Sequence, residues 1–133
     1  MSGNVFFDSN ILIYAYTQAG ERTERARELV SLGGIVSVQV LNETANTLRR
    51  KFLVTWSRAG KIIDEIVESC PNPLPLRLET HRAAMRICER YGYSVYDGLI
   101  VASALEGGCM KLYSEDMQDG QIIEGLRIEN PFL

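Results

Sequence analysis

Several residue types are scarce in this sequence, and each scarcity narrows the range of functions. The 133 residues include only three cysteines, Cys70, Cys88 and Cys109, an odd number without a C-x-x-C spacing. This pattern argues against both a disulfide framework and a zinc knuckle, so we expect reduced, buried thiols in a cytoplasmic protein. The single histidine, His81, lies among charged residues of an expected helix, which favours a surface role over catalysis. No G-x-x-x-x-G-K-[ST] loop is present, which removes nucleotide triphosphatases from consideration.

Long apolar runs and an excess of positive charge are also lacking. No apolar run approaches the roughly 18 residues of a membrane span, and no basic region followed by an apolar stretch opens the chain, so we expect neither a membrane segment nor a secretory signal. Fourteen Lys and Arg residues against seventeen Asp and Glu residues give a net charge of -3. That sign is wrong for binding nucleic acid through the overall field, so any such binding must be local. A hydrophobic content of 46% suits one compact domain over residues 1–133.

Short apolar runs alternate with amphipathic segments along the chain. We expect strands at 4–8, 35–38, 110–113 and 126–128, with a short extended piece near 76–78. We expect helices at 9–16, 21–32, 39–52, 55–69, 79–91 and 96–106, and the last of these is apolar nearly all round, which is typical of a buried helix. Strands that alternate with helices predict an α/β fold with three α/β/α layers and a central, mostly parallel sheet.

Acidic residues stand where the expected strands end. Asp8 closes the first strand, Asp116 follows the strand at 110–113, and Asp97 opens the buried helix. Glu43 lies about a turn and a half into the helix after the second strand, off its apolar stripe. Because ligands of such sheets bind outside the carboxyl ends of the strands, we expect these four acids to converge at one edge. Asp119 can join them from the loop that carries Asp116.

Each acid has a simpler explanation when it is taken alone. Asp8 and Asp97 are good helix caps, Glu43 can be a solvated helix residue, and the acids of the 114–120 loop are common turn residues. The joint pattern favours a shared site, because clustered carboxylates repel one another unless a cation holds them together. Oxygen ligands without clustered His or Cys indicate Mg²⁺ or Mn²⁺ rather than zinc.

Four blocks of sequence carry a resemblance to a known family. They are FFDSNILIYAY at 6–16, NE at 42–43, YSVYDGLIVASAL at 93–105 and LYSEDMQDG at 112–120. In this order, and over nearly the whole chain, they resemble the signature blocks of the PIN-domain ribonucleases, and among these the VapC-type toxins of bacterial toxin-antitoxin pairs. The resemblance implies a PIN-like fold, metal-dependent cleavage of RNA, a small antitoxin partner and a homodimer.

The resemblance also implies roles for individual residues. Catalysis and the binding of Mg²⁺ or Mn²⁺ are carried over to the four acids, Asp8, Glu43, Asp97 and Asp116. Asn10 and Ser114 match supporting polar positions of the family, where they would orient ligands; their simpler role is to cap and turn the backbone. Asp119 matches an acid that only some members have, and it receives a lesser role.

RNA also needs local positive charge and surfaces for its bases. Candidate phosphate contacts are the basic residues of the expected helices, Arg22, Arg25, Arg27, Arg49, Arg50, Lys51 and Lys61. Tyr93 and Trp56 are aromatic candidates for stacking with bases of single-stranded or looped RNA, although both can equally belong to the core. The segments ILIYAY and ERTERARELV offer apolar faces to a partner helix, with helical core as the competing explanation.

Other functions remain to be compared with the nuclease. A phosphorylatable receiver needs an acidic pair after the first strand, and a haloacid-dehalogenase-like phosphatase needs D-x-D, whereas Ser9-Asn10 follows Asp8 here. The stronger alternative is a non-catalytic RNA-binding or assembly module that retains the PIN fold. Metal-dependent cleavage of RNA distinguishes the nuclease from that module.

Overall fold

A four-stranded sheet lies at the centre of the computed structural model, which describes residues 4–133. Its strands are β1 (Val5–Phe7), β2 (Lys111–Tyr113), β3 (Ile122–Ile123) and β4 (Leu126–Glu129). The spatial order is β1-β2-β4-β3, in which β1, β2 and β4 are parallel and β3 runs antiparallel to β4. The parallel strands place their carboxyl ends, and therefore the residues that follow them, at the same edge of the sheet.

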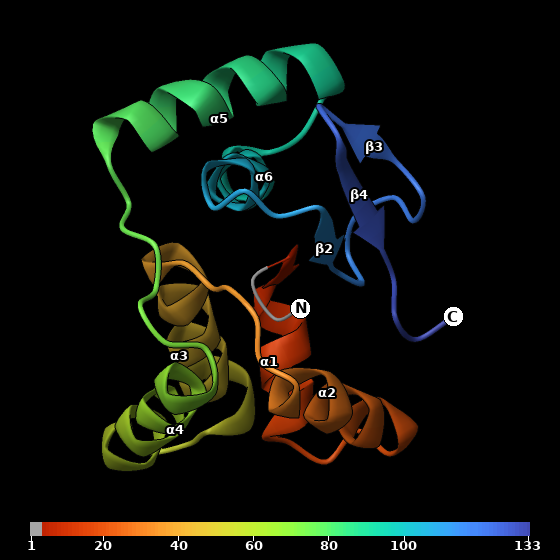
Figure 1. Ribbon diagram of the computed structural model, residues 1–133. Coiled ribbons are helices and arrows are strands. Elements are labelled where there is room, and N and C mark those ends of the chain that lie inside the picture. Colours follow the sequence, from red (N-terminus) through yellow and green to blue (C-terminus); the bar gives the residue numbers. More distant parts are fainter. Residues whose placement is uncertain (1–3) are drawn as a thin grey trace.

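Helices cover both faces of this sheet. They are α1 (Ser9–Ala15), α2 (Glu21–Ser31), α3 (Val38–Phe52), α4 (Trp56–Ser69), α5 (Leu78–Tyr91) and α6 (Val95–Glu106). Figure 1 shows α1 to α4 gathered on one side, and α5 outside α6 on the other. The expected three-layer α/β/α fold with a mostly parallel sheet is therefore confirmed. Among the described residues, no helix combines the length and the apolar character that a membrane span requires.

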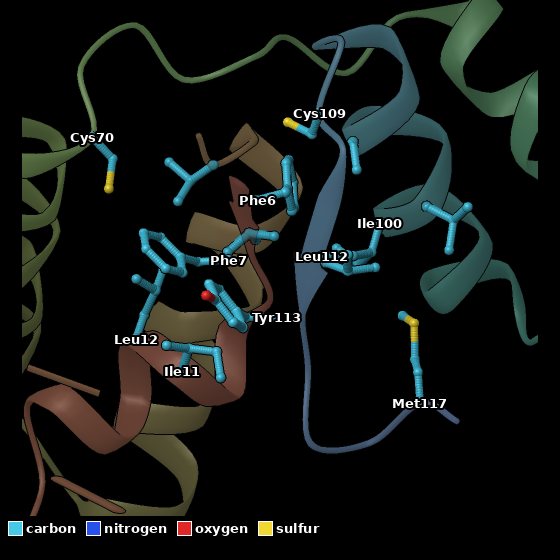
Figure 2. Close-up of a cluster of buried hydrophobic side chains, with 14 of the residues drawn as sticks. Phe6, Phe7, Ile11, Leu12, Cys70, Ile100, Cys109, Leu112, Tyr113 and Met117 are labelled. Carbon is cyan, nitrogen blue, oxygen red and sulfur yellow. The ribbon is translucent and has the colours of Figure 1, made fainter. Parts of the chain in front are cut away.

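The core continues through the sheet because both faces of β1 and β2 are buried. Phe7 pairs in register with Tyr113, and their rings stack with centroids 6.0 Å apart. Phe6 pairs with Leu112, and these two side chains, which are fully buried, belong to the opposite face because neighbours along a strand alternate. Figure 2 shows Leu112 beside Ile100 of α6. This register places the residues after β1 and β2 next to each other.

The strand expected at 35–38 is wrong, because only two isolated bridges form there, at Ile35 and at Ser37. Ile35 exchanges backbone hydrogen bonds with β1, but Ser37 already caps α3 by accepting a bond from the Val40 N–H at 3.2 Å. The extended piece expected near 76–78 lies earlier in the chain, where Leu74 bridges to Ser37. Leu78 instead begins α5. Because Ser37 is the N-cap residue of α3, the extended segment ends there and contains two single bridges in place of a strand.

A short hairpin at the C-terminal end was not expected from the sequence. β3 and β4 are joined by Glu124 and Gly125, whose φ angles are 49° and 89°. Positive φ at both loop residues is the geometry of a type I′ turn, which favours a two-residue hairpin. β3 contains only two residues, too few for an alternating pattern to reveal it.

Candidate active site

Asp8 follows β1 and is both a helix cap and a buried acid. It is the N-cap residue of α1 and is only 4% exposed. Its Oδ1 accepts a hydrogen bond from the Ser9 N–H at 2.7 Å, and its Oδ2 accepts one from the Ser114 hydroxyl at 2.8 Å. Because a carboxylate has about four lone-pair sites, these two bonds leave acceptor capacity for a further ligand.

The loop after β2 is held against α1 by Asn10. The Asn10 Nδ2 donates to Asp116 Oδ2 at 3.0 Å, and the Asn10 Oδ1 accepts from the Glu115 N–H at 3.2 Å. The buried Ser114 hydroxyl, which donates to Asp8, also accepts from the Asp116 N–H at 3.2 Å. Asn10 and Ser114 thus fix the positions of two acids through a closed set of hydrogen bonds.

Glu43 and Asp97 come from two helices. Asp97 lies in the first turn of α6, where its N–H donates to the hydroxyl of the N-cap residue Ser94 at 3.3 Å. Glu43 lies in the second turn of α3, which Ser37 caps. Both acidic side chains are partly buried. The two N-caps set where each helix begins and therefore where each acid is placed.

The pKa values of these acids show that they act on one another. Burial is the largest influence and raises the pKa of Asp8 to about 6, even though hydrogen bonds from Ser114 and Ser9 lower it. Burial, together with the charges of Asp8 and Asp97, raises the pKa of Glu43 to about 7. Burial and the charge of Asp116 raise the pKa of Asp97. Asp8, Glu43 and Asp97, whose pKa values are raised, and Asp116, whose charge contributes to raising all three, form an acidic cluster.

The predicted site residues therefore separate into two groups. The structure brings together Asp8, Glu43, Asp97 and Asp116, with Asn10 and Ser114 as their supports. Asp119 is not among the charges that shift the pKa values of this cluster. Its Oδ1 instead accepts from the Asn130 N–H at 2.8 Å, which ties its loop to the C-terminal segment.

The acidic cluster has the chemistry of a site for a hard divalent cation. Its donors are all carboxylate oxygens, the ligands that Mg²⁺ and Mn²⁺ prefer. A cation would relieve the repulsion and burial that raise the pKa values of Asp8 and Glu43. Over residues 4–133, no three acidic, histidine or cysteine side chains are yet arranged as a set of metal ligands. The donor set fits such an ion, with Asp8, Glu43, Asp97 and Asp116 as the residues that would hold it.

A comparison with family models identifies the fold. The model of the PIN domain matches residues 5–118 of the chain. The chain belongs to the PIN-domain family. The match begins at β1 and ends in the loop after β2, so it includes every residue of the acidic cluster. The resemblance carried by the four sequence blocks is confirmed.

Two solved structures resemble this PIN domain. VapC20 of Mycobacterium tuberculosis, described as a sarcin-ricin loop cleaving toxin, has 19% identity and a TM-score of 0.69, over 84% of this chain and 89% of that chain. The second structure is described as VapBC2 from Rickettsia felis bound to a DNA fragment from the VapBC2 promoter. It has 16% identity and a TM-score of 0.68, over 95% of this chain and 97% of that chain. At these identities the similarity establishes a shared fold. A comparison with curated protein sequences gives no significant match.

Most of the basic residues predicted to contact RNA have partners within the PIN domain. The Arg22 Nε lies 2.6 Å from Glu115 Oε2, and the Arg27 Nε donates to the Ala15 carbonyl at 2.8 Å. The Arg49 guanidinium donates to the Val54 carbonyl at 2.9 Å. Over residues 4–133, three of the seven candidates are exposed and have neither an ion pair nor a side-chain hydrogen bond: Arg50, Lys51 and Lys61.

The two aromatic candidates differ in their exposure. Trp56 is 67% exposed at the start of α4, and the Arg49 guanidinium lies 4.8 Å from its ring centre. Tyr93 is partly buried, and its hydroxyl forms a hydrogen bond with the Gln121 side chain.

A polar cleft beside the acidic cluster was not predicted from the sequence. It has a volume of about 420 Å³ and lies between α3 and α6, with the lining residues Gln39, Asn42, Glu43, Asn46, Arg50 and Tyr96. We call it the α3/α6 cleft. Its signal in the sequence is the 4-3-4 spacing of Gln39, Glu43, Asn46 and Arg50, which places polar side chains on one face of a helix. That spacing does not reveal that Tyr96 faces them.

Proposed function

We propose that this PIN domain is a Mg²⁺- or Mn²⁺-dependent endoribonuclease and the toxin of a toxin-antitoxin pair. The observation that carries the proposal is the acidic cluster, in which the charge of Asp116, from the loop after β2, contributes to raising the pKa values of Asp8, Glu43 and Asp97. The VapC description of both similar structures supports the toxin assignment. A non-catalytic RNA-binding module would have no use for four acids that repel both one another and RNA.

The residues of the cluster have separate tasks in this proposal. Asp8, Glu43, Asp97 and Asp116 would hold the ion, which when bound would polarise the phosphodiester and lower the pKa of an attacking water. Ser114 keeps Asp8 in place through the 2.8 Å bond, and Asn10 does the same for Asp116. Without the ion Glu43 has a pKa of about 7, so binding of the ion near neutral pH would displace a proton from this side chain. No protein nucleophile is needed when water is the attacking group.

The proposed partners are RNA in the cytoplasm, an antitoxin and a second copy of the chain. A groove of about 390 Å³ between α1, α2 and α4 is lined by apolar and basic residues, including Tyr16, Arg27, Val30 and Arg58. Its location matches the two segments predicted to offer a face for a partner helix. Ala26 and Leu29 of α2 are buried in the core, so the antitoxin would contact the groove rather than these two side chains.

Cleavage of labelled RNA by the purified protein tests the nuclease. We expect cleavage with Mg²⁺ or Mn²⁺ and none with EDTA. Asp8→Asn and Asp97→Asn should each lower the rate by at least 100-fold, because each removes a charge that would hold the ion. The thermal transition of Asp8→Asn should stay in place or rise, since Asn can still accept the Ser9 bond and the repulsion is reduced.

Asp119→Asn is the matched control for these variants. Its side chain can still accept the bond from the Asn130 N–H, and Asp119 is outside the acidic cluster. We expect cleavage close to that of the unaltered protein. Full activity of Asp8→Asn, or cleavage that continues in EDTA, would contradict the proposed site. Absence of cleavage with either ion, by folded protein free of antitoxin, would favour the non-catalytic module.

A further inference from the structure

The α3/α6 cleft shares a residue with the acidic cluster. Glu43 belongs to both, and the remaining lining residues extend from it along α3 to Arg50 and across to Tyr96 of α6. Its volume of about 420 Å³ lies within the roughly 300 to 1,000 Å³ that small-molecule sites occupy. A ligand group in this cleft would therefore lie beside the proposed reaction centre.

The cleft wall follows from the pattern of α3. Val40, Thr44 and Leu48 are buried and form the core-facing side of the helix. Asn46 and Arg50 lie on the cleft side, and a helix rises about 1.5 Å per residue, so Arg50 is roughly 10 Å along the axis from Glu43. The wall thus grades from an acidic end at the cluster to a basic end.

Several lining side chains have unused hydrogen-bonding groups. Within residues 4–133, no side-chain hydrogen bond or ion pair involves Asn42, Asn46, Arg50 or Tyr96. Tyr96 is 59% exposed, although its ring carries a large apolar surface. The neighbouring Arg49, by contrast, donates to the Val54 carbonyl and covers the Trp56 ring. The cleft therefore offers amides, a ring and a guanidinium to an external ligand.

We propose that the α3/α6 cleft binds one unpaired base of the RNA substrate beside the acidic cluster. The inference rests on the proposed nuclease function and names a subsite of it. Tyr96 provides a face on which a base stacks, and the carboxamides of Asn42 and Asn46 offer both donors and acceptors to the base edge. Arg50 provides the charge for a phosphate. Only a splayed, single-stranded base has its face and edges free for such contacts.

Binding measurements on non-cleaving protein test this subsite. The protein is the Asp8→Asn variant in EDTA, and the probes are labelled uridine hexamers whose central nucleotide is A, C, G, U or abasic. We expect Tyr96→Ala, made in the Asp8→Asn background, to lower the affinity for base-containing hexamers by about 5- to 100-fold. The affinity for the abasic hexamer should fall much less. Tyr96→Phe should retain most of the affinity because the ring remains.

Two further variants separate recognition from charge. Asn46→Ala should narrow the differences in affinity among the four bases, because a carboxamide reads their edges. Arg50→Ala should lower the affinity for all hexamers, including the abasic one, by similar factors. It should also reduce the dependence of binding on salt concentration. Phe52→Ala is the control: Phe52 is an exposed ring on the same helix that does not line the cleft, so no change is expected.

The outcomes distinguish this subsite from the nuclease itself. Base-dependent binding that is lost in Tyr96→Ala supports the subsite even if no RNA is cleaved. The subsite would be overturned if the folded Tyr96→Ala variant and its Asp8→Asn parent bound base-containing hexamers with equal affinity. If the unaltered protein still cleaved RNA, the proposed nuclease function would stand. Equal affinities for abasic and complete hexamers would also overturn it. Stronger base-dependent binding of the matching DNA hexamers would overturn the assignment to RNA.

Discussion

Asp8 shows how one side chain serves both the backbone and the acidic cluster. A helix cap needs an oxygen acceptor at the end of β1, and the Ser9 N–H uses Oδ1 for this purpose. A cap alone does not require 4% exposure or a pKa of about 6, because most caps are exposed to water. The second oxygen is occupied by Ser114, from the loop after β2. Asp8 therefore joins two strand ends as well as starting α1.

Replacement of Ser114 by Ala should change both stability and pH dependence. The hydroxyl is buried and bonds to Asp8, and this bond lowers the pKa of the acid. In Ser114→Ala the pKa of Asp8 should rise above about 6, so the acidic limb of the cleavage-rate profile should move to higher pH. Urea denaturation at pH 8 should show that the free energy of unfolding falls by about 1 to 3 kcal/mol.

Ser103→Ala is the matched control for this substitution. Ser103 is also buried, but its hydroxyl has no hydrogen-bond partner within residues 4–133. Removing an unsatisfied hydroxyl should leave the free energy of unfolding unchanged or raise it by about 1 kcal/mol. Equal losses in the two variants would show that packing, rather than the bond to Asp8, accounts for the effect of Ser114→Ala.

Sequence reasoning at the residue scale succeeded where position along a strand or helix is decisive. Asp8 and Asp116 were predictable because both follow parallel strands, and Glu43 was predictable because it lies off an apolar stripe. The exposure of Trp56 was not predictable, because hydrophobicity favours burial and the neighbouring Arg49 covers its ring only in the folded protein. Tyr96 became informative only when the structure showed which residues of α3 it faces.

At the scale of elements, the packing of α5 on α6 positions Asp97. A Cβ on Gly98 would lie 2.9 Å from the Ala84 carbonyl oxygen and 2.5 Å from the Cys88 sulfur. We therefore expect Gly98→Ala to push α6 away from α5, to lower the free energy of unfolding by about 1 to 3 kcal/mol and to reduce cleavage through the displacement of Asp97. Urea denaturation and cleavage rates measure the two effects.

Gly60→Ala provides the opposite expectation. Gly60 lies inside α4, and a Cβ there would meet nothing within 4 Å. Because Ala restricts the unfolded chain and favours a helix, the free energy of unfolding of this variant should rise by about 0.5 to 1 kcal/mol. A Gly98→Ala protein as stable as the parent would contradict the close approach of the two helices.

Element boundaries were less predictable than element types. The six helices within residues 4–133 were all expected, because their apolar periodicity or strong apolar character extends over many residues. The segment 35–38 has the composition of a strand, but a capping serine at 37 starts α3 and leaves only two isolated bridges, at Ile35 and at Ser37. β3 was missed because the hairpin depends on positive φ at Glu124, and glutamate is not a residue type that indicates such a turn.

At the scale of the whole molecule, the fold concentrates negative charge at one edge of its sheet, and this has a cost in stability. The pKa of Asp8 is about 6, raised from 3.8, and that of Glu43 is about 7, raised from 4.5. The folded state thus binds protons more tightly than the unfolded state. The associated stability is fully present below pH 4 and is lost as the pH rises through 6 to 7. For Asp8 the loss is up to about 3 kcal/mol.

We therefore expect the metal-free protein to lose more stability between pH 5 and pH 8 than the Asp8→Asn variant does. Mg²⁺ or Mn²⁺ should restore stability at pH 8, where the carboxylates are ionised, and have little effect at pH 5, where protons compete for them. Thermal melting in EDTA and in metal, at both pH values, gives the four comparisons for each protein. Because Asp8→Asn removes one titrating group, its pH dependence should be shallower and its response to metal smaller. If the stability of the two proteins depended on pH in the same way, the pKa of Asp8 would not be raised by folding. If metal stabilised the protein equally at pH 5 and pH 8, the ion would bind outside the acidic cluster.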